Sequence, residues 1–298
     1  ADTRMRMPIW LSHFVSGGIA GCSAKTVVAP FDRAKILYQT NHPFYKHAFT
    51  SVFETIGQIV HKEGITHLWK GNTATIARIF PYAAVQFMAY EKYKQFVMKD
   101  IEEGEIHFFR HLLCGSLAGM TAVLATYPLD LMRARMASEV GKNHKYKGIY
   151  HGFTTLVRTE GFFSIWKGLG ASIQGIVPYA GVNFSVYETL KVLAPKNKDG
   201  ELQTTWRLIC GGAAGAIGQT VAYPWDVVRR RRQTMGFAPG SPDIKVTGTY
   251  SVMLHIIKKE GPRGLYRGIT INYWKVTPAV SISFMVYEWM KDTLTPYT

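Results

Sequence analysis

The chain has 298 residues, of which 47% are hydrophobic and 18% are charged, and its formal net charge is +15. This apolar content excludes a disordered basic tail, while the charge predicts an anionic partner such as nucleic acid, anionic lipid or an acidic substrate. Cys22, Cys114 and Cys210 lack metal-ligand spacing, so we interpret them as free thiols in a reducing compartment. We expect no cleavable signal peptide, because the opening residues ADTRMRMPIW lack an apolar core.

Four short elements recur three times in the same order, which indicates an internal repeat. The first is a glycine pair at GxxxG spacing, and the second is a proline followed by an acid two residues later and a base five residues later. The third is a W-K-G or Y-R-G triplet, and the fourth is Y-E-x-x-K. We therefore predict three repeats, at residues 1–101, 102–199 and 200–298. The prolines and the acid–base pairs that follow them are Pro30 with Asp32/Lys35, Pro128 with Asp130/Arg133 and Pro224 with Asp226/Arg229.

Each repeat contains two long apolar stretches. Three of the six stretches carry no charged residue, and the others each contain one base: Lys25, Arg78 or Lys275. Because about 20 helical residues cross a bilayer core, we predict six spanning helices with both termini on one side. A soluble protein with long buried helices is the alternative. In chain order the stretches are Leu11–Phe31, Gly71–Tyr90, Leu112–Leu129, Gly168–Tyr187, Leu208–Trp225 and Gly268–Tyr287.

Charge is unevenly distributed between the connections. Residues 35–70, 133–167 and 229–267 together hold 20 basic and 6 acidic residues, whereas residues 94–107 and 191–207 hold six of each. We therefore place the three long connections on one side of the membrane, although the positive-inside rule alone does not decide which side. The run Arg229–Arg232 extends one repeated position and lacks a recognition helix or zinc spacing, so we expect no nucleic-acid binding.

These elements resemble the repeated signature of the mitochondrial carrier family: P-x-[DE]-x-x-[KR], then aromatic-[KR]-G, then [FY]-[DE]-x-x-[KR]. The resemblance covers essentially the whole chain. It implies an all-α membrane protein: a monomeric bundle of six transmembrane helices with pseudo-threefold symmetry and short matrix helices. It also implies the mitochondrial inner membrane, termini toward the intermembrane space, and alternating access around one central site without a metal or cofactor.

The resemblance further assigns the repeated charges to two gates, because charges in a membrane normally face the bundle interior and find partners. Solvated surface pairs are the alternative. The matrix gate would pair Asp32 with Arg133, Asp130 with Arg229 and Asp226 with Lys35, with Gln39 and Gln233 as braces and Ala137 in place of a third. The cytoplasmic gate would pair Glu91 with Lys191, Glu188 with Lys291 and Glu288 with Lys94, beside Tyr90, Tyr187 and Tyr287.

The third element is expected to lie at the membrane surface. Backbone N–H groups at a helix start can bind phosphate, and the resemblance assigns these positions to cardiolipin. Ordinary interfacial anchoring by Trp and Tyr is the alternative. The residues concerned are Lys70/Gly71, Lys167/Gly168 and Arg267/Gly268.

The three isolated bases are the clue to the substrate. Lys25, Arg78 and Lys275 have no acid nearby in sequence, so we expect them to bind a phosphate-bearing anion. A structural counter-ion role is the alternative. The resemblance makes Arg78, Lys275 and the pair Gly175–Ile176 the substrate contact points, to which Arg230 contributes. A glycine–aliphatic pair there is typical of carriers of adenine nucleotides.

The segments at residues 78–94 and 272–284 resemble the coenzyme A carrier branch of the family. We therefore predict exchange of coenzyme A with adenine nucleotides, with ADP, ATP and adenosine 3′,5′-diphosphate as candidate substrates. An ADP/ATP or ATP-Mg/phosphate-type exchanger is the first alternative, although the sequence has no EF-hand extension. A carrier-like structural subunit of a respiratory complex is the second. We expect no enzyme activity, because no nucleophile–base pairing, Walker loop or metal cluster is evident.

Overall fold

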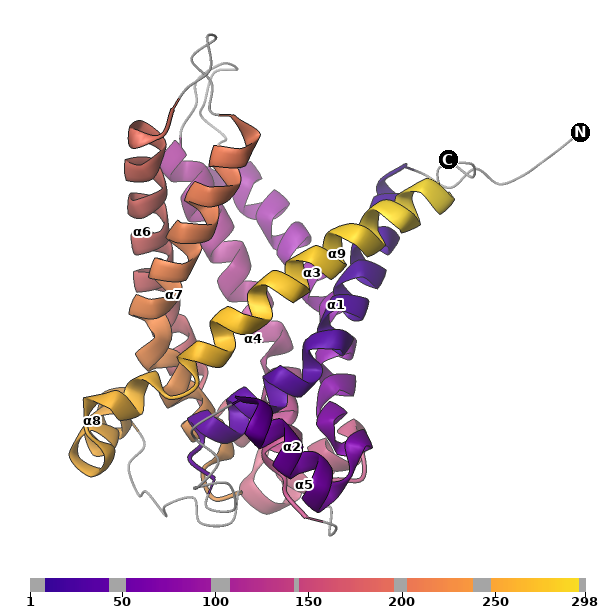
Figure 1. Cartoon of the computed structure of the whole chain (residues 1–298), viewed down its shortest axis with the longest axis vertical. Coiled ribbons are helices and arrows are strands. Elements are labelled where there is room, and N and C mark those ends of the chain that lie inside the picture. The colour runs from indigo at the N-terminus through magenta and orange to yellow at the C-terminus, as the bar shows by residue number, and fades with distance from the viewer. Residues whose placement is uncertain are drawn as a thin grey trace, which may run out of the picture.

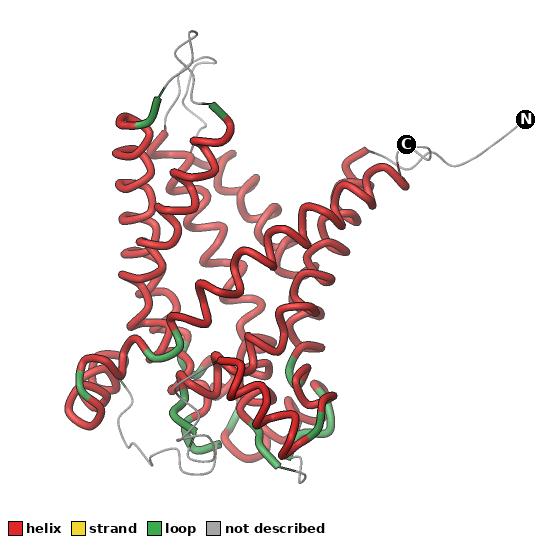
Figure 2. Tube along the Cα trace, viewed as in Figure 1, coloured by secondary structure: helices red, strands yellow, loops and turns green. Residues whose placement is uncertain are grey.

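The computed structural model describes residues 9–42, 52–97, 108–141, 145–195, 203–237 and 248–294, and within them it contains helices and no strand (Figure 2). A short 3₁₀ helix precedes the second long helix of each repeat: η2 (Ile65–Trp69), η3 (Phe162–Trp166) and η4 (Pro262–Tyr266). The α-helices are α1 (Ile9–Gln39), α2 (Val52–Glu63), α3 (Asn72–Val97), α4 (Phe108–Ser138), α5 (Ile149–Glu160), α6 (Leu169–Leu193), α7 (Thr204–Thr234), α8 (Thr249–Glu260) and α9 (Ile269–Leu294).

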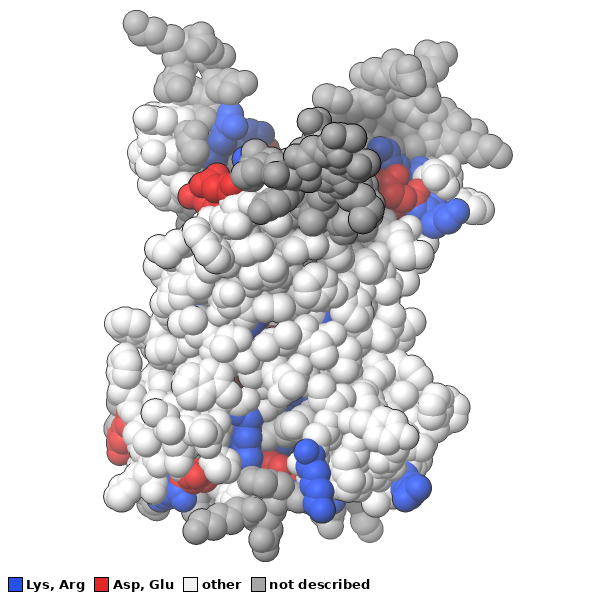
Figure 3. Space-filling view, turned by 90° about the vertical axis from the view of Figure 1, so that its right-hand side faces the viewer, with Lys and Arg blue, Asp and Glu red and all other residues white. Residues whose placement is uncertain are grey.

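Six of these helices are long, with 25 to 31 residues each. At 1.5 Å per residue they measure about 37 to 46 Å, longer than the bilayer core. By length and composition, two described segments are apolar enough to cross a membrane, Ser12–Gln39 and Arg110–Ser138. The other four long helices do not meet this criterion, which combines hydropathy with a limit on charged residues. The face in Figure 3 nevertheless shows a broad uncharged band between two charged ends.

The long helices pack mainly across repeat boundaries. In Figure 1, α3 lies along α4, α6 along α7, and α9 returns to lie along α1, so the third repeat closes on the first. The short helices α2, α5 and α8 gather at one end of the bundle. At the other end the beginning of α1 and the end of α9 lean away from α6 and α7. The bundle is therefore narrow at the end with the short helices and open at the opposite end.

Three equivalent apolar clusters hold the narrow end together. Each joins the C-terminal part of the first long helix of a repeat (α1, α4 or α7) to the short α-helix and the 3₁₀ helix that follow it. The cluster residues are Leu37, Ile59 and Leu68 in the first repeat, Leu131, Leu156 and Ile165 in the second, and Val227, Ile256 and Leu265 in the third.

The glycine of each W-K-G or Y-R-G triplet packs closely against the neighbouring repeat. Gly71, Gly168 and Gly268 have φ values of +82°, +90° and +81°, which L side chains rarely adopt. A Cβ atom on Gly71 would lie 2.8 Å from the carbonyl oxygen of Arg133, and one on Gly168 would lie 3.1 Å from that of Arg229. The triplet therefore needs glycine for both its turn and its close contact with a neighbouring long helix.

Candidate functional site

Three aspartates meet three bases where α1, α4 and α7 converge. Arg133 Nη2 lies 2.5 Å from Asp32 Oδ2, and Arg229 Nη2 lies 2.5 Å from Asp130 Oδ2. The third pair, formed by Lys35 and Asp226, is longer, at 3.7 Å. Each acid therefore meets the base that the family resemblance implies, and the three pairs join α1, α4 and α7 in a ring. The last third of each helix, which begins at its internal proline, carries these charges.

Asp130 has the most partners. Besides Arg229, it accepts hydrogen bonds from Arg78 Nη1 at 3.2 Å, Arg230 Nη1 at 3.3 Å and Gln233 Nε2 at 2.9 Å. Its side chain is only 1% exposed. A buried carboxylate needs such a set of donors, because an uncompensated buried charge is strongly destabilising.

Asp226 accepts fewer hydrogen bonds than the other two acids within the described chain. Its side chain is 36% exposed, against 10% for Asp32. Gln219 Nε2 donates to Asp226 Oδ2 at 3.1 Å, while Lys35 Nζ donates to Asn272 Oδ1 at 2.9 Å. The contact between α1 and α7 is therefore the weakest side of the ring.

Two of the three isolated bases have acidic partners after all. Arg78 on α3 pairs with Asp130 at 3.2 Å, and Lys275 on α9 pairs with Asp32 at 2.8 Å. The expectation that these cations lack a neutralising acid was wrong, because the fold brings together residues that are distant in sequence. Lys25 makes no hydrogen bond or ion pair within the described part of the chain, although Asp32, Lys275, Arg133 and Arg78 all act on it electrostatically.

The two predicted braces behave differently. Gln233 Nε2 donates both to Asp130 and to the Tyr127 hydroxyl at 3.0 Å, and its Oε1 accepts from Arg230 at 2.8 Å. Gln39 Nε2 donates to the Tyr223 hydroxyl at 3.2 Å, and its Oε1 has no partner within the described chain. Gln39 therefore does not span the Lys35–Asp226 pair as expected, since Lys35 is drawn toward Asn272.

Gln233 meets Tyr127 between α7 and α4, and Gln39 meets Tyr223 between α1 and α7. The interface between α4 and α1 has neither a glutamine nor a tyrosine at the equivalent positions. Ala137 stands where the other two repeats have glutamine, and Ala29 stands where they have Tyr127 and Tyr223. Asp32, Lys70 and Arg133 line a small space here of about 10 Å³ together with both alanines. The interface between α1 and α4 therefore relies on the short Asp32–Arg133 ion pair.

A pocket of about 150 Å³ lies between α6 and α7, beside Asp226. Gly175 and Ile176 line it on α6, and Gln219 and Trp225 line it on α7. A Cβ atom on Gly175 would lie 3.0 Å from Trp225 Cβ, so the glycine lets the two helices approach closely. Gly175 and Ile176 are therefore placed beside the charged ring, in a mixed apolar and polar pocket.

A second ring of charges lies beyond the first, and the sequence analysis missed it. Arg33 pairs with Glu63, Arg135 with Glu160 and Arg231 with Glu260, each within one repeat. The glutamate recurs in every E-G that precedes a 3₁₀ helix, which was the available signal. The arginine is harder to find, because it follows the proline by seven residues in the second and third repeats but by three in the first.

The same arginines reach the next repeat. Arg33 Nε donates to the carbonyl oxygen of Ala137 at 3.3 Å and Arg135 Nε to that of Gln233 at 3.0 Å. Arg231 Nε donates to the carbonyl oxygen of Gln39 at 3.0 Å and completes the cycle. These bonds satisfy carbonyl groups that the last helical turn leaves without intrahelical partners. They join the ends of α1, α4 and α7 to one another.

The basic residue of each triplet contacts the glutamate of this second ring. Lys70 lies 3.6 Å from Glu63, Lys167 lies 2.5 Å from Glu160 and Arg267 lies 3.3 Å from Glu260. Burial alone would raise the pKa of the Glu160 carboxyl, but the hydrogen bonds from Arg135 and Lys167 lower that pKa to about 2. The basic side chains proposed to face lipid phosphate are therefore already engaged with carboxylates, while the backbone of Gly71, Gly168 and Gly268 lies at the helix starts.

At the open end, the tyrosines and charges of the fourth element lie on helix ends that diverge (Figure 1). Glu188 and Lys191 form an ion pair at 3.5 Å within α6, and Tyr187 packs beside the small cluster of Ala194 and Cys210. Tyr90 shares a hydrogen bond of 3.1 Å with His111 Nδ1, and Tyr287 shares one of 2.9 Å with His13 Nδ1. Glu91, Lys94, Glu288 and Lys291 lie near the same ends, on α3 and α9. Within the described part of the chain, the predicted Glu91–Lys191 and Glu288–Lys94 pairs are not formed in this conformation.

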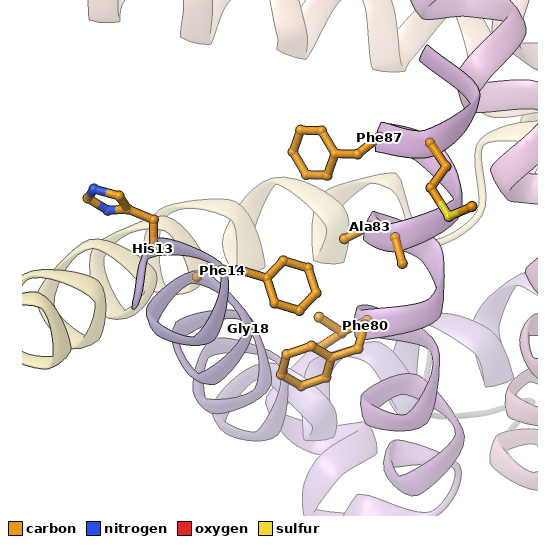
Figure 4. Close-up of a pocket in the computed structure, with 10 residues that line it drawn as sticks. His13, Phe14, Gly18, Phe80, Ala83 and Phe87 are labelled. Atoms are coloured by element: carbon orange, nitrogen blue, oxygen red, sulfur yellow. The ribbon is translucent and has the colours of Figure 1, made fainter. Parts of the chain in front are cut away.

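An apolar pocket of about 800 Å³ lies between α1 and α3, toward the open end (Figure 4). Phe14, Phe80 and Phe87 project into it, and the rings of Phe14 and Phe80 are 5.5 Å apart. Gly18 leaves room for Phe80, since a Cβ atom there would lie 2.3 Å from the ring. The lining contains no Lys, Arg, Asp or Glu, so this pocket offers no such cation to a phosphate group.

Each of the three repeats matches a known protein family. The sequence profile described as "Mitochondrial carrier protein" matches this chain at residues 8–101, 104–198 and 200–298. The chain is 46% identical over 289 residues to "Mitochondrial substrate carrier family protein P" of Dictyostelium discoideum, covering 96% of this chain and 94% of that protein. It is 44% identical over 299 residues to "Solute carrier family 25 member 16" of Mus musculus (95% and 88%). It is 38% identical over 305 residues to "Mitochondrial carrier protein CoAc2" of Zea mays (97% and 88%).

Proposed function

Because the chain belongs to the mitochondrial carrier family, we propose that it exchanges coenzyme A and adenine nucleotides across the mitochondrial inner membrane. A single central site carries out the exchange by alternating access. The observation that carries this proposal is the cluster of Lys25, Arg78 and Lys275 beside the aspartate ring, next to the Gly175–Ile176 pocket. The similarity to the Zea mays protein named CoAc2 supports coenzyme A as one of the substrates.

Lys25 is the first anchor for a substrate phosphate. Its ammonium group interacts electrostatically with Arg78 and Lys275, so we expect an anion that binds Lys25 to attract both. Phosphate oxygens suit Lys and Arg, because charge-assisted hydrogen bonds to them are short and strong. Three cations from α1, α3 and α9 thus converge on one phosphate-binding region.

The pocket between α6 and α7 is the place for the adenine ring. Gly175 and Ile176 offer a flat apolar wall, and Trp225 offers a ring for stacking, which is favourable for flat aromatic groups. Gln219 supplies an amide that can hydrogen-bond to a base edge when it leaves Asp226. A nucleotide would therefore span the site, with its phosphates at α1, α3 and α9 and its base at α6 and α7.

Substrate binding also acts on the aspartate ring, which we assign as the matrix gate. Arg78 and Lys275 hold Asp130 and Asp32 in the conformation described here. A phosphate group competes with these carboxylates for the two cations, so it removes part of the positive charge that neutralises Asp130 and Asp32. The ring can then open while Tyr90, Tyr187, Tyr287 and the six charges at the other end close as the cytoplasmic gate, as population shift requires.

The orientation of the protein in the membrane is the one that the family resemblance implies. We place the termini in the intermembrane space and the short helices α2, α5 and α8 on the matrix side, where the basic long connections lie. Cardiolipin phosphate would bind at the starts of α3, α6 and α9 through backbone N–H groups, since Lys70, Lys167 and Arg267 are paired with glutamates.

A thermal-shift screen of the purified protein tests the proposal, because a ligand that binds the folded state raises its apparent stability. The ligands are coenzyme A, ADP, ATP, adenosine 3′,5′-diphosphate, phosphate and keto acids. We expect stabilisation by coenzyme A and adenosine 3′,5′-diphosphate. Stabilisation by ADP and ATP alone would favour a plain adenine nucleotide exchanger. No shift with any nucleotide would contradict the proposal and favour a structural role.

A further inference from the structure

The first long helix of each repeat carries an internal proline, which deprives one carbonyl group of its usual helical partner. Proline has no N–H group, so it cannot donate to the carbonyl oxygen four residues before it. Within a membrane, no water replaces the missing donor, and helices bend most readily at such a position. The carbonyl groups concerned belong to Thr26 before Pro30, Leu124 before Pro128 and Thr220 before Pro224.

In the first two repeats a tryptophan supplies the missing donor. Trp69 Nε1 donates to the Thr26 carbonyl oxygen at 2.8 Å, and Trp166 Nε1 donates to the Leu124 carbonyl oxygen at 3.3 Å. Both tryptophans belong to the W-K-G triplet and end the 3₁₀ helices η2 and η3. In the first repeat Asn72 Nδ2 also donates to the Thr26 hydroxyl at 3.2 Å. The triplet region is therefore bonded to the helix segment that precedes the proline.

These two hydrogen bonds bridge the proline. Each 3₁₀ helix shares an apolar cluster with the segment that follows the proline, through Leu37 and Leu68 in the first repeat and Leu131 and Ile165 in the second. The indole at the end of the same 3₁₀ helix bonds to the segment that precedes the proline. A change in the angle between the two segments must stretch or break this bond, so the tryptophan stiffens α1 and α4 at the proline.

The third repeat lacks this bridge. Tyr266 stands in place of the tryptophan, has no ring N–H group, and stacks on Tyr223 with 6.4 Å between the ring centres. The Thr220 hydroxyl donates to the Ala216 carbonyl oxygen at 2.7 Å and shares a hydrogen bond with the Tyr273 hydroxyl. Within the described part of the chain, no side chain donates to the Thr220 carbonyl oxygen. Helix α9 therefore holds the side chain of Thr220 but not its carbonyl group.

The same helix, α7, forms the weakest side of the aspartate ring. Asp226 follows Pro224 by two residues, lies 3.7 Å from Lys35 and has a side chain that is 36% exposed. The other two aspartates lie 2.5 Å from their bases and are more buried. The helix without a bridge at its proline is thus also the helix whose acid is held least firmly.

Building on the proposed function, we infer that the matrix gate opens first at α7. Trp69 and Trp166 hold α1 and α4 at their prolines, whereas Tyr266 leaves α7 able to bend there. Bending of α7 separates Asp226 from Lys35 before the two shorter ion pairs break. The two tryptophans are positioning residues, since they act through the helix backbone and not on the substrate.

Hydrogen–deuterium exchange of the purified full chain tests the inference, because it reports the local opening of each helical segment. We expect residues 217–228 of α7 to exchange faster than the equivalent residues 23–34 of α1 and 121–132 of α4, after correction for intrinsic exchange rates. One net hydrogen bond changes an equilibrium constant by about two- to tenfold, and we expect a difference of that size. Equal exchange in the three segments would overturn the inference.

Substitutions test whether the indole N–H is the cause. Trp69→Phe and Trp166→Phe keep an aromatic ring but remove the donor, so each should speed exchange at its own proline about two- to tenfold. Tyr266→Trp supplies the missing donor and should slow exchange in residues 217–228. Tyr266→Phe is the matched control, because it changes the same side chain without adding an N–H group. Unchanged exchange in both Trp→Phe variants would mean that the tryptophans do not stiffen the helices.

Counter-exchange in liposomes connects the bending of α7 to the gate. We expect Tyr266→Trp to lower the maximal rate of nucleotide exchange about two- to tenfold, with a smaller change in the half-saturating substrate concentration, and Tyr266→Phe to keep both. A stiffened α7 with an unchanged maximal rate would overturn the inference and leave the proposed function intact. Absence of any nucleotide exchange by the wild-type protein would contradict the proposed function itself, whereas deuterium exchange does not depend on the identity of the substrate.

Discussion

Lys275 on α9 donates to Asp32 on α1 at 2.8 Å, and the same carboxylate accepts from Arg133 on α4 at 2.5 Å. One aspartate therefore holds both a proposed substrate-binding cation and a proposed gate base. Arg78 stands in the same relation to Asp130 and Arg229. This arrangement couples the occupancy of the site to the integrity of the ring, because a substrate phosphate and an aspartate compete for one cation.

The first prediction concerns these two cations. Arg78→Ala and Lys275→Ala should each abolish exchange without unfolding the protein. Asp130 keeps Arg229, Arg230 and Gln233 when Arg78 is removed, and Asp32 keeps Arg133 when Lys275 is removed. Exchange in liposomes and the unfolding temperature in detergent are the two measurements. Near-normal exchange in both variants would remove these residues from the site.

The second prediction compares the two glutamines. Gln233→Ala takes a donor from the buried Asp130, so we expect a loss of about 1–3 kcal/mol in stability and an easier opening of the matrix gate. Gln39→Ala is the matched control, because Gln39 contacts Tyr223 but none of the three aspartate–base pairs. Unfolding temperatures should fall more for Gln233→Ala. Equal losses in both variants would argue against a direct brace on the ion pair.

The third prediction concerns the glycine of the second triplet. In Gly168→Ala a side chain must adopt φ of +90°, and the new Cβ would lie 2.8 Å from the Tyr127 hydroxyl. We expect destabilisation by about 1–3 kcal/mol from the backbone alone. Gly181→Ala, within the helix α6 that follows Gly168 and with nothing within 4 Å of the new Cβ, should be neutral or slightly stabilising. Denaturation curves of the two variants provide the comparison.

The fourth prediction is a pH dependence at the second ring. The pKa of Glu160 is about 2 in the folded protein and 4.5 for an unperturbed carboxyl. A lowered folded-state pKa adds stability that is fully present above pH 4.5 and is lost as pH falls from 4.5 toward 2. The difference in unfolding temperature between wild type and Glu160→Gln should therefore shrink over that range. A difference that stays constant down to pH 2 would mean that the carboxylate charge does not stabilise the fold.

The repeat made part of this site predictable. The family resemblance assigns Asp32 to Arg133 and Asp130 to Arg229, and both pairs are formed in the structure. Family membership and the helical, threefold architecture were likewise predictable and are confirmed. The contacts of Arg78 and Lys275 were not, because they join residues 52 and 243 positions apart on helices whose tilt the sequence does not reveal.

Departures from symmetry were also beyond the sequence analysis. Gln39 and Gln233 occupy equivalent positions, yet only Gln233 reaches an ion pair, since the side chain of Lys35 turns to Asn272. Arg33 performs in the first repeat what Arg135 performs in the second, from one helical turn earlier. Such shifts depend on side-chain reach between helices, which a motif alignment does not encode.

The most direct test of the central claim is counter-exchange in liposomes containing the purified protein. Vesicles loaded with ADP are given labelled coenzyme A outside, in wild type and in Arg78→Ala, with Lys92→Ala as a control. We expect uptake that requires internal nucleotide, is lost in Arg78→Ala and is retained in Lys92→Ala. Uptake of neither coenzyme A nor any adenine nucleotide by the folded wild-type protein, or equal uptake by Arg78→Ala, would contradict the proposed exchange function.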